Sequence, residues 1–286
     1  MPPIKLIECP RDAMQGWKSF IPTEQKVRYI QSLLNVGFHT LDFGSFVSPK
    51  AIPQMADTKE VLRLLNLDAS LPTKLLAIIA NERGAEEATA FDEITYLGFP
   101  FSVSETFQQR NTNSSIAESL KRVETIFTTC EKNKKELVVY LSMGFGNPYG
   151  DPWNEEIVFK WGNQLAQMGI RILSLADTVG VATPEQVYQM TSFMIQELPE
   201  CEIGVHLHAT NTNWKSKVDA AYKAGCIRFD GALRGIGGCP MAKDELVGNM
   251  DTVSIISFLD EQNVNLSINK EALAESLLIA DELFKS

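Results

Sequence analysis

Two of the three histidines in this chain lie two residues apart, in the run Val205-His206-Leu207-His208. The residue pattern around them indicates a β-strand, on which positions i and i+2 face the same side. Both imidazoles would then point into one space, where a single metal ion could bind both. Imidazole pairs suit zinc, copper, nickel or iron, and with added oxygen ligands they also bind manganese or magnesium. A hydrogen-bonded structural pair fits equally well, because histidine is intermediate in burial.

The composition excludes several classes of protein. The chain has 286 residues, of which 44% are apolar and 22% charged, with a formal net charge of -10. These values are typical of a globular protein that buries a full core. The acidic excess argues against a nucleic-acid or anionic-membrane surface, since phosphate affinity requires clustered Lys and Arg. No apolar run has the length of a membrane span and no signal-peptide core begins the chain, so we expect no membrane association.

The cysteines indicate a reducing compartment. They are five in number and none is spaced as Cys-x-x-Cys, which argues against a disulfide framework or a zinc ribbon. We therefore expect free thiols and a cytoplasmic protein. The five are Cys9, Cys130, Cys201, Cys226 and Cys239.

Strand-like and helix-like segments alternate along the whole chain, with helical patterns beginning at Thr23 and after the cap residue Thr183. Eight alternations in roughly 250 residues favour one domain, 1–286, folded as a (β/α)8 TIM barrel with extra C-terminal helices. A doubly wound sheet would need a Gly-rich turn after the first strand, whereas Pro10 is expected to open a loop there. The expected strands are 4–9, 39–43, 74–80, 93–99, 136–143, 171–175, 202–208 and 228–233.

Chemistry in such a barrel collects where the strands end, and His39, which opens the second strand, would lie at the opposite end. One carboxylate, two imidazoles and an amide oxygen at one mouth would form a mixed oxygen and nitrogen site. The candidate residues at the strand ends include no pair of cysteines, so this site favours Mg²⁺ or Mn²⁺ over tetrahedral zinc. The polar residues at or beyond strand ends are Arg11, Asp12, Asp42, Asp177, Thr178, His206, His208 and Asn249.

With these residues the chain resembles the 3-hydroxy-3-methylglutaryl-CoA lyases, within a wider family of metal-dependent lyases and Claisen-condensing enzymes on TIM barrels. The similarity extends from about residue 4 to the last helices. Each motif is weak alone, and their occurrence in this order is specific. The matching segments are 10–12 with Gln15, 45–50 with 53–55, 111–119, 177–180, 206–208, and 237–240 with 248–249.

The resemblance implies roles for these residues. Arg11 would neutralise the enolate oxygen that forms as the thioester is cleaved. Cys239, on a Gly-rich loop, would act in proton transfer. The cofactor would be Mg²⁺ or Mn²⁺, and the implied metal ligands are Asp12, His206, His208 and Asn249.

The same resemblance implies further catalytic and binding groups. Asp42, Asp177 and His206 would complete the catalytic set. Gln15 and Lys18 match positions near the CoA-binding face. An acyl-CoA substrate, with CoA as part of it, and a homodimer are implied on the same ground.

Each of these residues also has an ordinary structural explanation. Cys239 could be an inert buried thiol, and Arg11 could form a surface ion pair that contributes little. Asp177 could cap the following turn, and Asn249 could cap the helix that begins nearby. The two residues near the CoA-binding face could equally be solvated loop residues.

Four differences from the lyase pattern concern the substrate. Asp42 replaces Glu and is one methylene shorter, so water could bridge a contact that the longer side chain makes. Ala209 replaces the Asp after the second histidine, which removes an outer-shell acceptor. Ala13 and Met14 replace Gly-Leu and add bulk near the substrate, and Asn147 replaces Cys. The chemistry is therefore more firmly indicated than the acyl group.

The leading hypothesis is a divalent-metal-dependent lyase that splits a 3-hydroxy-3-methylglutaryl-type CoA thioester into acetyl-CoA and a 3-oxo acid such as acetoacetate. The resemblance associates this reaction with leucine degradation and ketone-body formation. A Claisen condensation of the isopropylmalate or homocitrate synthase type is the second hypothesis, although those enzymes usually carry a C-terminal regulatory domain. A third is a catalytically idle barrel that binds a metal or acyl-CoA, which the Asp42 and Ala209 differences favour.

Overall fold

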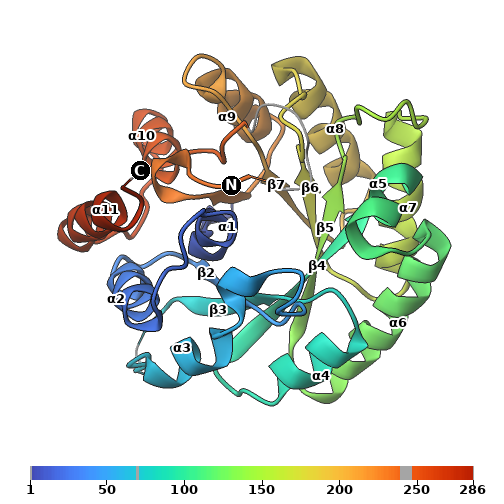
Figure 1. The fold of residues 1–286 in the computed structure, drawn as a ribbon. Helices are drawn as coiled ribbons and strands as arrows, with labels where there is room; N and C mark the ends of the chain where they lie inside the picture. Colours follow the sequence, from blue (N-terminus) through green and yellow to red (C-terminus); the bar gives the residue numbers. More distant parts are fainter. Residues whose placement is uncertain (1, 69–70, 239–246, 286) are drawn as a thin grey trace.

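The computed structural model describes residues 2–68, 71–238 and 247–285. Eight parallel strands form a closed barrel in sequence order, and β8 pairs back onto β1 (Figure 1). The expected (β/α)8 TIM barrel is therefore confirmed. The strands are β1 (Lys5–Glu8), β2 (Thr40–Ser45), β3 (Lys74–Ile78), β4 (Ile94–Ser102), β5 (Glu136–Ser142), β6 (Ile172–Ala176), β7 (Glu202–His206) and β8 (Arg228–Gly231).

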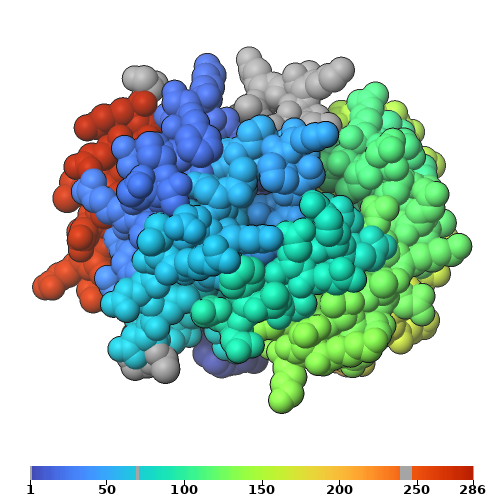
Figure 2. All heavy atoms as spheres, turned by 60° about the horizontal axis from the view of Figure 1, so that its bottom comes forward, coloured from blue at the N-terminus to red at the C-terminus, as the bar shows by residue number. Residues whose placement is uncertain are grey.

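Helices surround the strands and cover the outside of the barrel (Figure 1). Helix α11 contacts α2, so the C-terminal part of the chain lies beside the N-terminal part (Figures 1 and 2). None of the described helices is both long and apolar enough to cross a membrane. The α-helices are α1 (Pro10–Gln15), α2 (Thr23–Leu34), α3 (Thr58–Leu64), α4 (Glu82–Thr89), α5 (Glu105–Thr112), α6 (Ile116–Lys132), α7 (Glu155–Gln167), α8 (Pro184–Glu197), α9 (Trp214–Lys223), α10 (Thr252–Glu261) and α11 (Lys270–Leu283), with short 3-10 turns η1 (Pro53–Met55) and η2 (Leu233–Gly235).

Local sequence signals set several helix starts as expected. Helix α2 begins at Thr23, and α8 begins directly after Thr183. The Thr183 hydroxyl accepts a hydrogen bond from the Gln186 N–H, and the Gln186 side chain accepts one from the Thr183 N–H. Such caps stabilise a helix by about 1 kcal/mol, because they satisfy N–H groups that have no partner within the helix.

Three boundaries differ from expectation. Pro10 begins helix α1 and not a loop, because the first helical position needs no N–H donor. Strand β2 continues beyond Asp42, so this carboxylate lies inside the strand and not at its end. Strand β7 ends at His206, and His208 forms an isolated antiparallel bridge with Asn249. That bridge brings the segment after β8 against the end of β7.

The interior of the barrel is more polar than is usual for this fold, where Val, Ile and Leu dominate. Its buried cluster contains Leu76 and Ile78 but also Tyr96. Arg228 on β8 is fully buried, and its guanidinium carbon lies 5.8 Å from the centre of the Tyr96 ring. Asp230 follows on the same strand and is also buried. Charged groups therefore occupy positions that hydrophobic packing alone would give to aliphatic residues.

Glu8, at the end of β1, joins three elements from a buried position. Its carboxylate accepts hydrogen bonds from the Leu233 N–H at 2.9 Å and from the Thr252 hydroxyl at 2.5 Å. Burial raises the pKa of Glu8 to about 8, although both hydrogen bonds oppose the shift. The folded protein therefore holds a proton here over a pH range in which the unfolded chain has lost it.

We expect Glu8→Gln to change the pH dependence of stability. The folded-state pKa of Glu8 lies above the ordinary 4.5, so its stabilising contribution is complete below about pH 4.5 and is lost as the pH rises through 8. Between these limits the wild-type free energy of unfolding should fall relative to the variant by up to about 1.4 kcal/mol per pH unit. Urea denaturation at several pH values measures the difference, and parallel curves would contradict the expectation.

Candidate active site

Arg11 links two carboxylates at the mouth of the barrel. Helix α1 follows β1 directly and places Arg11 and Asp12 above the strand ends. The Arg11 Nε donates to both Asp42 oxygens, at 3.2 and 3.1 Å, and its Nη1 donates to Asp12 Oδ1 at 2.9 Å. Burial raises the pKa of Asp42 to about 6 while Arg11 opposes the shift, so Asp42 is mainly ionised at neutral pH. One guanidinium thus holds two buried carboxylates in a fixed geometry.

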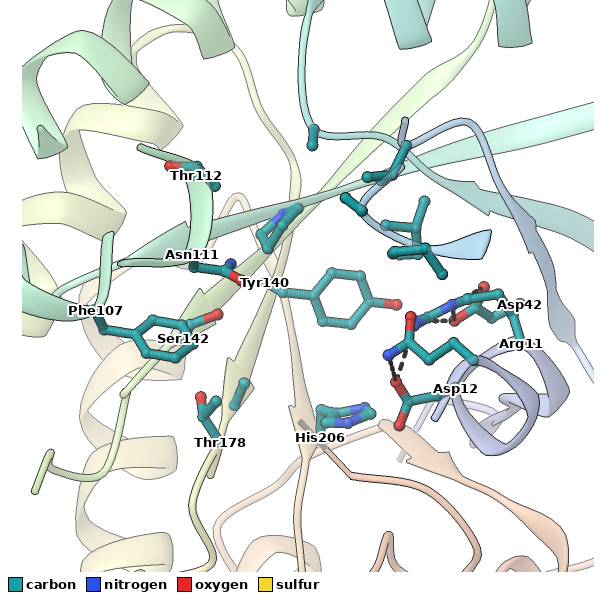
Figure 3. A pocket seen from close by; sticks show the side chains of 18 of the residues that line it. Arg11, Asp12, Asp42, Phe107, Asn111, Thr112, Tyr140, Ser142, Thr178 and His206 are labelled. Carbon is teal, nitrogen blue, oxygen red and sulfur yellow. Dashed lines mark hydrogen bonds and ion pairs between the residues drawn. The ribbon is translucent and has the colours of Figure 1, made fainter. Parts of the chain in front are cut away.

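The second carboxylate, Asp12, accepts hydrogen bonds from three side chains. Besides Arg11, the donors are Gln15 Nε2, at 2.8 Å, and Asn249 Nδ2, at 2.7 Å. Burial alone would raise the pKa of Asp12, but Arg11, His206 and the Asn249 hydrogen bond lower it overall. Asp12 therefore stays ionised and points towards His206 (Figure 3).

His206 and His208 lie close together, as the strand pattern predicts. Their ring centres are 5.4 Å apart. His206 Nδ1 lies 3.2 Å from Asp230 Oδ2. Burial alone would lower the pKa of His206, but Asp230 raises it overall. His208 differs, because burial and the nearby His206 lower its pKa and favour the neutral ring.

Asn249 carries an unusual buried acceptor. Its Nδ2 donates to Asp12 and, at 2.9 Å, to the Ile236 carbonyl. Its Oδ1 is buried and has no hydrogen-bond partner among the described residues. A buried acceptor left unpaired costs about 1–3 kcal/mol unless a ligand satisfies it. Among the described residues, the group of potential ligand atoms that the structure brings within 4.8 Å of one another is that of Cys9, His206 and Asp230. A carboxylate, two imidazoles and an amide oxygen, as in the expected set of Asp12, His206, His208 and Asn249, are ligand types that would suit Mg²⁺ or Mn²⁺.

Arg11, Asp12, Asp42 and the two histidines line a cavity of about 400 Å³, and Asn249 is not among its described lining residues. This volume is within the range of small-molecule sites. Val47 and Ile52 are among the apolar residues of the lining, so a ligand would meet apolar as well as charged groups. The lining residues are Arg11, Asp12, Gln15, Asp42, Val47, Ala51, Ile52, Ile78, Ala80, Pro100, Phe107, Asn111, Thr112, Tyr140, Ser142, Ala176, Thr178, His206 and His208.

Tyr140 is a cavity residue that the sequence did not single out. Its side chain lies in the middle of the cavity with the hydroxyl towards Arg11 and Asp42 (Figure 3). That hydroxyl has no hydrogen-bond partner among the described residues. Burial raises the pKa of Tyr140 well above its usual range, so the hydroxyl remains a donor. The sequence pattern that could have identified Tyr140 is the alternation on β5, because it turns Tyr140 and Ser142 inward together.

Other expected site residues have different surroundings. Asp177 Oδ2 accepts a hydrogen bond from Lys217 Nζ at 2.7 Å, and Asp177 Oδ1 accepts one from the Ala182 N–H at 3.1 Å. Asp177 does not line the described cavity, so its observed contacts are structural. Lys18 is exposed after α1 and also lies outside the cavity wall. The expected proton-transfer residue Cys239 lies outside the described residues.

The structure places several of the residues that differ from the lyase pattern. Asp42 contacts Arg11 directly, so no water is needed to bridge this pair. Ala13 and Met14 are buried in the hydrophobic core and neither lines the described cavity. Asn147 accepts hydrogen bonds from the Tyr149 N–H at 3.0 Å and the Asp151 N–H at 3.1 Å. It therefore shapes its own loop.

A family model and several curated proteins match this chain over most of its length. A family model described as HMGL-like matches residues 4–277. The chain is 32% identical to mouse mitochondrial hydroxymethylglutaryl-CoA lyase over 276 residues, which are 96% of this chain and 83% of that protein. It is 32% identical to hydroxymethylglutaryl-CoA lyase YngG of Bacillus subtilis over 264 residues, covering 92% of this chain and 87% of that one.

Solved structures show the same likeness. The HMG-CoA lyase structure from Bacillus subtilis has a TM-score of 0.91 and 30% identity, covering 99% of this chain and 94% of that one. An HMG-CoA lyase from Acinetobacter baumannii, in complex with coenzyme A and 3-methylmalate, has a TM-score of 0.90 and 30% identity. That match covers 98% of this chain and 91% of the other.

We expect Asn249→Ala to weaken Mn²⁺ binding by about tenfold or more, because the variant loses the buried amide oxygen and the donor that orients Asp12. Electron paramagnetic resonance of free Mn²⁺ measures the affinity in metal-stripped protein. His39→Ala is the control, since His39 directly precedes β2 and hydrogen-bonds Thr40 at the other end of the barrel. Equal Mn²⁺ affinity of folded Asn249→Ala and wild type would contradict this assignment.

Proposed function

We propose a specific reaction for this chain, which belongs to the HMGL-like family and is a hydroxymethylglutaryl-CoA lyase-like enzyme. The substrate is 3-hydroxy-3-methylglutaryl-CoA or a close 3-hydroxyacyl-CoA. The products are acetyl-CoA and acetoacetate, or the corresponding 3-oxo acid. The observation that carries the proposal is the unpaired buried oxygen of Asn249, whose Nδ2 donates to Asp12, next to a cavity that Asp12 and Arg11 line.

The donor set implies dependence on a divalent cation. Asp12, His206, His208 and Asn249 would hold Mg²⁺ or Mn²⁺. Such a cation lowers the pKa of a bound hydroxyl and orients a chelating substrate. Asp12 contributes the charge, and its three hydrogen bonds fix the direction of both carboxylate oxygens.

Arg11 stabilises the negative charge that develops during cleavage. As the C2–C3 bond breaks, the C3 hydroxyl passes its proton to a base, for which we propose the cavity carboxylate Asp42, and becomes the ketone of the 3-oxo acid. The bonding electrons pass to the thioester as an enolate. Three of the five guanidinium N–H groups of Arg11 are used by Asp12 and Asp42, so two remain for the enolate oxygen among the described contacts. Asp42 keeps the guanidinium plane fixed as that charge forms. The Tyr140 hydroxyl supplies another donor on the same side.

The enolate carbon must then receive a proton to give acetyl-CoA. We assign this step to the Cys239 thiol, on the Gly-rich sequence pattern of Gly237 and Gly238 that precedes it. This Gly-rich segment is tightly confined, because a Cβ at Gly237 would come within 2.6 Å of Asn249 Nδ2 and 2.8 Å of the Asp12 carbonyl oxygen. Gly237 also has a φ of +103°, which glycine adopts readily. The segment therefore lies directly beside the proposed metal ligands.

The remaining proposals concern the coenzyme and the assembly. We propose that Gln15, which lines the cavity, and the exposed Lys18 contact the CoA portion, and this rests on the family resemblance. We propose a homodimer, which rests on the family resemblance alone. A cytoplasmic location is supported by the free thiols of the described cysteines Cys9, Cys130, Cys201 and Cys226.

We expect EDTA-stripped protein to release acetyl-CoA and acetoacetate from 3-hydroxy-3-methylglutaryl-CoA only after Mg²⁺ or Mn²⁺ is added. Cys239→Ala should lose most of this turnover, because the enolate then lacks its proton donor. Cys130→Ala is the matched control, since Cys130 is buried in α6 away from the cavity. Metal-independent cleavage would refute the metal dependence, and an inert wild type would refute this substrate.

We expect Arg11→Met to lower kcat by about 10²- to 10³-fold, the usual effect of removing one oxyanion donor. Methionine keeps much of the side-chain bulk but leaves Asp42 without a cation. Arg11→Met with Asp42→Asn, compared with Asp42→Asn alone, therefore tests whether the loss comes from the missing charge or from an unpaired carboxylate. Equal activity of the double variant and Asp42→Asn alone would contradict the role of Arg11.

A further inference from the structure

His206 faces a buried carboxylate on the neighbouring strand. In the β7–β8 pairing, His206 and Asp230 lie directly opposite each other. His206 Nδ1 is 3.2 Å from Asp230 Oδ2, and the Asp230 side chain is fully enclosed, with 0% exposure. Of the two ring nitrogens of His206, Nδ1 therefore faces Asp230 on the barrel wall. The His206 ring itself lines the cavity.

We propose that Asp230 is a positioning residue, which fixes His206 as the Nδ1–H tautomer and so presents the Nε2 lone pair to the cavity. A neutral imidazole has one donor nitrogen and one acceptor nitrogen. The Nε2–H tautomer would set the Nδ1 lone pair against a carboxylate oxygen, which is repulsive. The inference rests on the proposed function only in assigning the Nε2 lone pair to a divalent cation.

The surroundings of the ring restrict its orientation further. The Tyr140 ring meets the His206 ring edge-on, with centres 5.9 Å apart and planes at 85°. The His208 ring lies on another side at 5.4 Å. Rotation of the imidazole would therefore require both rings to move. The hydrogen bond to Asp230 and these two contacts together define one ring position.

Asp230 is itself held beside a buried cation. Arg228 precedes it by two residues on β8, so both side chains share one face of the strand, and the Arg228 guanidinium lies over the Tyr96 ring. Arg228 Nη1 donates to Glu202 at 3.3 Å, while its Nε and Nη2 and the Asp230 Oδ1 have no hydrogen-bond partner among the described residues. Burial alone would lower the pKa of Arg228, but Asp230 is the main group that raises it. The carboxylate therefore has a counter-charge that does not compete for the oxygen facing His206.

His208 provides an internal contrast. No hydrogen bond to either of its ring nitrogens is formed by the described residues, and the Asp expected after it is Ala209. Its backbone carbonyl, in contrast, accepts from Lys217 at 2.8 Å. The ring of His208 thus lacks the carboxylate that His206 has. We expect one tautomer at His206 and a mixture at His208.

The tautomers can be measured without metal or substrate. Long-range ¹H–¹⁵N correlation spectra of metal-free protein labelled with ¹⁵N-histidine distinguish the protonated from the unprotonated ring nitrogen. The chain has three histidines, so His39→Gln and His208→Gln variants assign the signals. The spectra are recorded at a pH high enough for the ring to be neutral, because Asp230 raises the pKa of His206. Under these conditions we expect wild-type His206 to be protonated at Nδ1 and unprotonated at Nε2. A predominantly Nε2–H ring in the wild type would overturn the proposal without any variant at Asp230.

Two variants test the cause. Asp230→Ala should shift His206 to a tautomer mixture and weaken Mn²⁺ binding by about 10- to 100-fold, the usual effect of losing an outer-shell partner. Asp230→Asn should be intermediate, because its amide oxygen still accepts from Nδ1–H. Ser174→Ala is the matched control, since it removes another buried polar group without a hydrogen bond to His206.

The outcomes separate the two proposals. An unchanged tautomer ratio in folded Asp230→Ala would overturn the positioning role, whatever the enzyme does to its substrate. A shifted tautomer with unchanged Mn²⁺ affinity would also overturn it, because the lone pair would then serve no bound cation. Failure of wild type to cleave 3-hydroxy-3-methylglutaryl-CoA, with the expected tautomer present, would refute the proposed function alone.

Discussion

The ion cluster of Arg11 with Asp12 and Asp42 is the constraint on which the site depends. All three side chains are almost completely removed from water, with exposures of 8%, 7% and 1%. Charges in such surroundings are tolerated only when they are paired and hydrogen-bonded, because each would otherwise cost several kcal/mol. The guanidinium bonds both carboxylates and therefore fixes α1 relative to β2. The cavity wall takes its shape from this arrangement.

The cluster also explains why the site is suited to a cation. Two carboxylates share one guanidinium, and the neighbouring Asn249, which donates to Asp12, has a buried amide oxygen without a partner among the described residues. The site thus has more negative charge and more lone pairs than its donors can satisfy. Asn249 reaches it because the segment after β8 folds back and forms a bridge with His208. A cation bound there would satisfy both deficits.

The barrel interior also contains buried charged groups. Arg228 and Asp230 replace the aliphatic layers that usually fill such barrels. This arrangement lowers the hydrophobic contribution to stability, and it gives His206 a fixed partner in return. The hydrogen bond between Asp230 and His206 restricts the ring to one arrangement more strongly than apolar packing would. The barrel interior therefore takes part in orienting the cavity residues.

Sequence alone determined the barrel and many of the site candidates. Eight strand and helix alternations predicted the fold, because burial of parallel strands requires nearly continuous apolar runs between amphipathic helices. The spacing of His206 and His208 predicted two rings in one space, since alternate strand residues share a face. Helix caps such as Thr183 could be recognised from the sequence because they depend on residues only a few positions apart.

The tertiary structure decided which polar residues meet. The pairs His206 with Asp230, Arg11 with Asp42, and Asp177 with Lys217 are 24, 31 and 40 residues apart. Their contacts depend on strand register and on the path of loops, which no local pattern records. For the same reason the sequence could not show that Tyr140 occupies the centre of the cavity. The residue types and their local periodicity follow from the sequence alone. Which side chains contact one another across different strands was decided only when the barrel closed.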